Sequence, residues 1–91
     1  REQLAVELSS AYGELAAARA AYPTAERRTA AAARAFDLVS ARDREGLANQ
    51  LAFLDARQTL TTSRLNLDII RMRLFIAAAR VDRALAATPL D

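Results

Sequence analysis

The chain has 91 residues, 53% of them hydrophobic, and a net charge of +2 from 13 arginines set against 11 acidic residues. A chain of this length forms one small domain at most, and its longest apolar run is far shorter than the roughly 20 residues that cross a bilayer. It contains no cysteine or histidine, which excludes disulfides, the usual zinc ligands and the commonest general base. The arginines are interleaved with acids, as on an ion-paired surface rather than a nucleic-acid-binding one. We therefore expect no catalytic residue, cofactor, metal or nucleic-acid partner.

The first of two long helices is expected over about residues 3 to 44. Alanine, leucine, arginine and glutamate, all strong helix formers, fill most of the chain. Small or apolar residues recur at alternating spacings of three and four, as on the packing face of a helix. This row contains Leu4, Leu8, Ala11, Leu15, Ala18, Tyr22, Ala25, Thr29, Ala32, Phe36 and Val39.

Pro23 interrupts this segment, and proline can either begin a new helix or kink an existing one. The row continues past Pro23 without a shift. Tyr22 is a poor N-cap, and Thr24 is followed three residues later by Arg27, where a capping box has Glu or Gln. We therefore expect one helix kinked near Pro23, with the carbonyl of Arg19 lacking its usual partner. The alternative is a three-helix bundle with Pro23 in a turn.

A turn is expected at about residues 45 to 48. Gly46 can adopt the left-handed conformation that closes a helix, and Asn49 is a suitable N-cap for the next one. The second helix is then expected over about residues 49 to 87, before Pro89. The predicted fold class is all-α: a long antiparallel helical hairpin of coiled-coil type that forms a single domain over residues 1 to 91.

The second helix carries two apolar rows rather than one. The first row contains Phe53, Ala56, Leu60, Ser63, Leu67, Ile70, Leu74, Ala77, Val81 and Leu85. The second row contains Leu51, Leu54, Gln58, Leu65, Ile69, Met72, Ile76 and Ala79. At about 100° per residue, the rows lie roughly 160° to 200° apart. Polar strips separate them, and Phe75 is an apolar exception within one strip.

Two opposed rows fit a helix that has a neighbour on each side and water on its other two faces. Such a helix would be part of a wall that is one helix thick, and we call each helix of this wall a stave. Alanines of the first helix, at 25, 30 to 33 and 35, allow neighbouring staves to pack closely. The alternative is a hairpin that dimerises into a four-helix bundle, although a bundle brings the two faces nearer to a right angle. The isolated hairpin is expected to be oligomeric because its second row lacks a neighbour.

The most specific motif is the cluster Gly-Leu-x-Asn-x-Leu-x-x-Leu-Asp-Ala at residues 46 to 56, which forms the turn and its exit. The other matching residues are Ala11, Tyr12 and Leu15 near the start, Arg57, and Arg83, Ala84 and Leu85 near the end. In this order they resemble the C-terminal helical repeat of the bacterial outer-membrane efflux proteins, the TolC family. The family often has a tyrosine where this chain has Asp43 and an aspartate where it has Ala52.

The resemblance implies that the chain is one hairpin from a larger periplasmic tunnel domain of a homotrimeric outer-membrane export duct, which serves multidrug, metal or secretion efflux. It also implies that the turn is a periplasmic tip that docks an adaptor protein and, through it, serves an inner-membrane pump. The tip residues expected to dock are Arg44, Glu45, Gly46, Leu47, Ala48 and Asn49. For Gly46 and Asn49 the alternative is that they only turn the chain.

Two other functions fit a helical hairpin. One is the hairpin of a periplasmic adaptor, or membrane fusion, protein, whose tip typically carries an Arg-Leu-Ser type motif that is absent here. The other is a small dimerising helical-hairpin interaction module.

Overall fold

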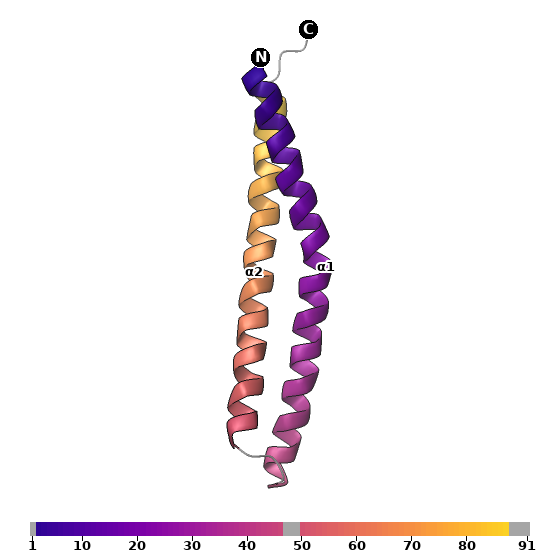
Figure 1. Ribbon diagram of the computed structural model, residues 1–91, viewed down its shortest axis with the longest axis vertical. Helices are drawn as coiled ribbons and strands as arrows, with labels where there is room; N and C mark the ends of the chain where they lie inside the picture. Colours follow the sequence, from indigo (N-terminus) through magenta and orange to yellow (C-terminus); the bar gives the residue numbers. More distant parts are fainter. Residues whose placement is uncertain (1, 47–49, 88–91) are drawn as a thin grey trace. The chain divides into compact units, whose positions relative to one another are not determined.

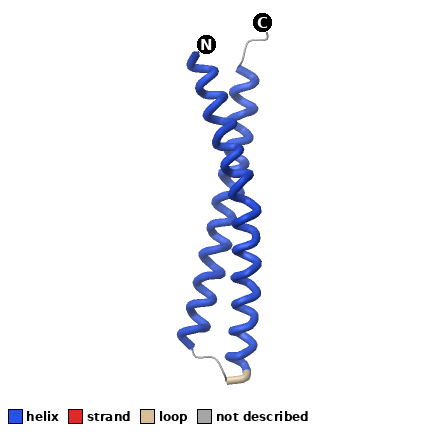
Figure 2. The backbone as a smooth tube through the Cα atoms, turned by 45° about the vertical axis from the view of Figure 1, so that its right-hand side comes forward, coloured by secondary structure: helices blue, strands red, loops and turns tan. Residues whose placement is uncertain are grey.

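The computed structural model describes residues 2 to 46 and 50 to 87. Helix α1 covers Glu2–Arg44 and helix α2 covers Gln50–Ala87. The two helices form an antiparallel hairpin (Figures 1 and 2). The predicted all-α hairpin is therefore confirmed. Helix α1 begins one residue earlier than expected, and the expected start of the second helix, residue 49, lies outside the described residues.

Helix α1 continues through Pro23 without interruption, so the three-helix alternative is wrong. A proline inside a helix removes one backbone donor, and its ring crowds the carbonyl four residues earlier. The packing face nevertheless continues on both sides of it, because Tyr22 is half-buried and Ala25 is buried, whereas Pro23 itself is exposed. All members of the row expected along α1, from Leu4 to Val39, are buried or half-buried. The row therefore predicted the face of α1 that packs against α2.

The contacts divide the hairpin into two units, one formed by Arg1–Tyr22 with Ile69–Asp91 and the other by Pro23–Asp68. The core of the first unit is a cluster of four residues with Leu74 packed against it. The four are Ala11, Leu15, Ala77 and Val81. Ala11 and Ala77 are 0% and 2% exposed, and such small side chains at the contact let the helix axes lie close together.

The second unit has a different core. Its buried residues are Ala25, Ala32 and Leu60. Nearer the turn, the rings of Phe36 and Phe53 lie 5.4 Å apart at an angle of 47°, an arrangement that aromatic pairs favour. The Thr29 hydroxyl lies 2.8 Å from the carbonyl oxygen of Ala25 and 3.1 Å from that of Ser63 on α2. The single Thr29 hydroxyl proton therefore has a carbonyl acceptor on each helix, so this polar residue in the packing face is not left without a partner.

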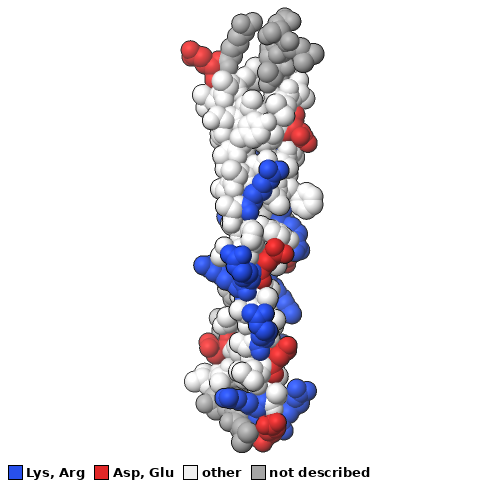
Figure 3. Space-filling model, turned by 90° about the vertical axis from the view of Figure 1, so that its right-hand side faces the viewer, with Lys and Arg blue, Asp and Glu red and all other residues white. Residues whose placement is uncertain are grey.

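The surface carries interleaved charges of both signs, as the arginines and acids on the face drawn in Figure 3 show. No helix in the described part of the chain is long and apolar enough to cross a membrane.

Candidate functional site

The turn after α1 is closed by backbone hydrogen bonds that end at Gly46. The Glu45 amide donates to the carbonyls of Ala41 and Arg42 at 3.2 and 3.1 Å, and the Gly46 amide donates to the carbonyl of Asp43 at 3.0 Å. The φ angle of Gly46 is 74°, in the left-handed region that glycine adopts at little cost. Together, the positive φ and the bond from Gly46 to Asp43 match one half of a Schellman cap. Gly46 therefore ends α1 in the way expected from the sequence.

The described part of the expected docking tip lies at the surface. Arg44, Glu45 and Gly46 are all exposed. A Cβ atom added at Gly46 would meet nothing within 4 Å, so only the backbone conformation restricts this position. The other three expected tip residues, Leu47, Ala48 and Asn49, lie outside the described residues. The adaptor-docking role of the tip stays a prediction.

The first apolar row of α2 is the row that faces α1. Leu60, Ala77 and Val81 are 6%, 2% and 6% exposed. Its half-buried members are Phe53, Ala56, Ser63, Leu67, Ile70 and Leu74. Leu85 departs from the expectation, because it is 48% exposed while Ala84 is half-buried. The step of four from Ala77 to Val81 is followed by a step of three to Ala84, as the helical repeat of 3.6 residues requires.

The second apolar row of α2 faces away from α1 in both units. Its large members are exposed by 41% to 76%: Leu51, Leu54, Leu65, Ile69, Met72 and Ile76. Single exposed apolar residues are common on protein surfaces, but a contiguous apolar patch marks an interaction site. The sequence predicted that these residues form a second packing row, and the structure shows that they are exposed on the side away from α1; their packing against a neighbouring helix stays a prediction. We name these six residues, together with Gln58 and Ala79 of the same row, the outer row.

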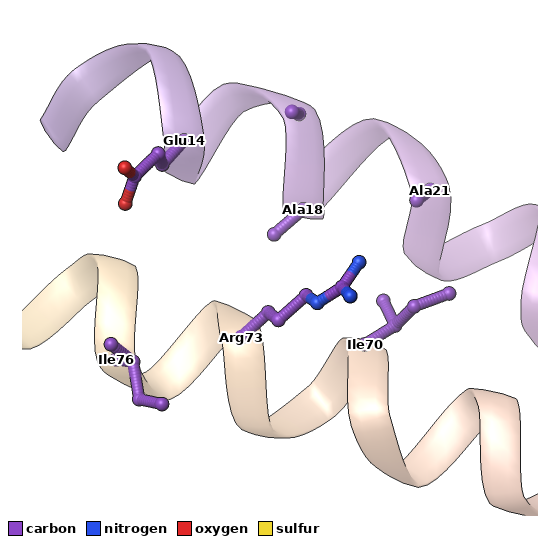
Figure 4. Close-up of a pocket in the computed structure, with 7 residues that line it drawn as sticks. Glu14, Ala18, Ala21, Ile70, Arg73 and Ile76 are labelled. Carbon is purple, nitrogen blue, oxygen red and sulfur yellow. The ribbon is translucent and has the colours of Figure 1, made fainter. Parts of the chain in front are cut away.

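A shallow hollow of about 490 Å³ lies beside the outer row in the first unit. Its lining residues are Glu14, Ala17, Ala18, Ala21, Ile70, Arg73 and Ile76. Figure 4 shows the Arg73 side chain extending along this hollow towards α1. The lining is therefore mainly aliphatic, with one carboxylate and one guanidinium among its residues. Sequence reasoning missed this hollow because it depends on small side chains from α1 meeting larger ones from α2.

Arginines at the flanks of α2 connect it to α1 in this unit. Arg80 forms an ion pair with Glu14. The guanidinium of Arg71 lies 5.9 Å from the centre of the Tyr22 ring, and Arg71 donates a hydrogen bond of 3.3 Å to the Tyr22 hydroxyl. Exposed pairs of these kinds contribute about 1 kcal/mol or less each. They therefore assist the apolar contact between the helices rather than replace it.

Within residues 2 to 46 and 50 to 87, no group of three or more Asp or Glu side chains lies close enough to hold a metal ion. The features that remain are the exposed tip at Gly46 and the outer row of α2. Comparison with known protein families, curated proteins and solved structures finds no match to this chain.

Proposed function

We propose that the hairpin is a stave in a wall of helices, and that the wall is the periplasmic tunnel of a homotrimeric outer-membrane export duct of the TolC type. The observation that carries the proposal is the exposure of the outer row on the side of α2 opposite α1. Leu60 is 6% exposed and packs inside the hairpin, whereas Leu65 is 59% exposed. A helix with two opposed apolar faces needs a neighbour on each side. Within the hairpin only one neighbour is present.

The length of α2 agrees with such a role. Its 38 residues span about 57 Å at 1.5 Å per residue. Neighbouring staves in a wall would cover the outer row over most of this length. The charged strips between the rows would then face water on the inner and outer surfaces of the wall.

The exposed tip is the basis for a second part of the proposal, which concerns a docking partner. A wall helix that turns back at Gly46 has its turn at the rim of the wall. The described tip residues Arg44, Glu45 and Gly46 are exposed and therefore accessible to a partner. We propose that this rim docks a periplasmic adaptor protein, which connects the duct to an inner-membrane pump. The proposal for the partner rests on the resemblance of residues 46 to 56 to the efflux family.

The docking role can be tested in the full-length protein that contains this hairpin. We expect Gly46→Val or Leu47→Asp to abolish export and site-specific cross-linking to the adaptor while the oligomer still assembles. Gly13→Ala is the matched control, because Gly13 lies within α1 and an added Cβ meets nothing within 4 Å. Unimpaired export and cross-linking in the two tip variants would refute the docking role.

The stave role has its own test. Single cysteines at Ile69 and Met72 should be protected from a water-soluble maleimide in the assembled protein. A cysteine at Arg64, an exposed position of α2 outside both apolar rows, should react. Equal labelling at all three positions would show that the outer row faces water, and the wall model would then be wrong. Protection of Ile69 and Met72 together with unimpaired docking in the tip variants would refute only the role of the tip.

A further inference from the structure

The hollow between the two helices of the first unit has the size and the lining of a small-molecule site. Its volume is about 490 Å³, within the range of about 300 to 1,000 Å³ that ligand sites occupy. Five of its seven lining residues are aliphatic: Ala17, Ala18, Ala21, Ile70 and Ile76. None of the seven is aromatic, so the lining offers no ring for stacking and favours an aliphatic chain.

The charges of this hollow leave one cation available to a ligand. The carboxylate of Glu14 forms an ion pair with Arg80. In the described part of the chain, Arg73 has neither a hydrogen bond nor an ion pair. Its side chain extends along the hollow towards α1 (Figure 4). A guanidinium presents paired N–H donors that match a carboxylate. The hollow therefore favours a ligand with an anionic head.

Glu14 limits the charge that this head can carry. Its carboxylate lines the same hollow as the Arg73 guanidinium. A dianion such as a phosphate monoester would be attracted by Arg73 and repelled by Glu14, because like charges raise each other's energy. A monocarboxylate has a single charge, which can be placed beside Arg73. The lining thus selects a monoanion over a dianion.

We propose that the hollow binds a small amphiphilic monocarboxylate, whose head pairs with Arg73 and whose aliphatic chain lies against the alanines and isoleucines of the lining. Arg73 is exposed, so the ion pair adds only modest affinity. Most of the affinity comes from the burial of the aliphatic chain. The site goes beyond the export role and does not depend on it, because every lining residue belongs to the first unit of the hairpin.

Octanoate is a suitable probe, and the protein is the 91-residue chain itself. In two-dimensional NMR, octanoate should shift the amide signals of Ala17, Ala21 and Arg73 and saturate with a dissociation constant of about 1 mM, as expected for so small a ligand. Butanoate, which is four methylenes shorter, should bind at least tenfold more weakly, because each buried methylene contributes up to about fourfold. Octylammonium has the same chain and the opposite charge, and it should bind at least threefold more weakly than octanoate. Equal binding of octanoate and octylammonium would overturn the proposal.

A pair of arginine variants tests the charge. Arg73→Gln should weaken octanoate binding about threefold and leave the binding of octanol unchanged, because the substitution removes only the cation. Arg83→Gln is the matched control, since Arg83 is also an exposed arginine of α2 in the first unit but does not line this hollow. It should leave the binding of both probes unchanged. An equal loss of octanoate binding in the two variants would mean that only the overall charge of the chain attracts the carboxylate, and the proposal would be wrong.

A pair of alanine variants tests the aliphatic lining. Ala17→Leu places a larger side chain in the hollow and should weaken octanoate and octanol binding at least threefold, because it displaces ligand methylenes that contribute up to about fourfold each. Ala16→Leu is the control, since Ala16 is also exposed on α1 but does not line this hollow. Circular dichroism shows whether both variants keep their helices. Octanoate binding that is unchanged in a helical Ala17→Leu variant would refute the placement of the ligand in this hollow.

Discussion

The two glycines of this chain allow one substitution, glycine to alanine, to be made in two opposite backbone environments. Gly46 has φ 74°, whereas Gly13 lies inside α1. At both positions an added Cβ would meet nothing within 4 Å. The added methyl group therefore makes no close contact at either position, and the backbone conformation alone decides whether the substitution raises or lowers the unfolding free energy.

The expected magnitudes follow from these conformations. At Gly46 an alanine must adopt a left-handed conformation, which costs roughly 1 to 2 kcal/mol for an L-residue. At Gly13 the alanine restricts the unfolded chain and favours the helix, which stabilises by about 0.5 to 1 kcal/mol. The two variants should therefore differ in unfolding free energy by about 2 kcal/mol. For a chain of this size, each kcal/mol corresponds to a shift in melting temperature of about 4 to 8 °C.

The assay is urea and thermal unfolding followed by the helical circular dichroism signal. All variants must be measured at one protein concentration, because self-association adds a concentration-dependent term to the measured stability. We expect Gly46→Ala to melt below the unmodified chain and Gly13→Ala above it. A shift of both variants in the same direction would refute the backbone explanation of the turn.

Two further pairs of variants test the packing between the helices. Leu60→Ala should lower the unfolding free energy by about 2 kcal/mol because it leaves a cavity at a buried position. Leu38→Ala, at a position 59% exposed, should change the unfolding free energy by less than about 0.5 kcal/mol. Equal effects in urea unfolding would mean that Leu60 is not part of the core. Ala77→Leu should destabilise by about 1 to 3 kcal/mol because α1 leaves no room at a position 2% exposed. Its control, Ala78→Leu, is at an exposed position and should leave the stability almost unchanged. An unchanged melting temperature for Ala77→Leu would show that the helices can separate at this position without cost.

Much of the fold was predictable because its signals are local. Helix formers fill both segments, and the one glycine between them has the positive φ that the turn requires. The phase of the apolar row through Pro23 was informative for the same reason, since a loop would have shifted it. The candidate site was less predictable. The grouping of Leu65, Ile69, Met72 and Ile76 into one row follows from the helical repeat, but their lack of a partner within the chain does not.

The amino-acid sequence by itself determined two helices, the turn at Gly46 and the membership of each apolar row, because helix propensity and the 3.6-residue repeat are properties of neighbouring residues. Only the tertiary structure decided which row of α2 packs against α1. Both rows are apolar enough to do so, and the choice depends on how side chains from distant parts of the chain fit. The contacts between Phe36 and Phe53 and between Thr29 and Ser63 join the first row to α1. The outer row is left exposed as a consequence.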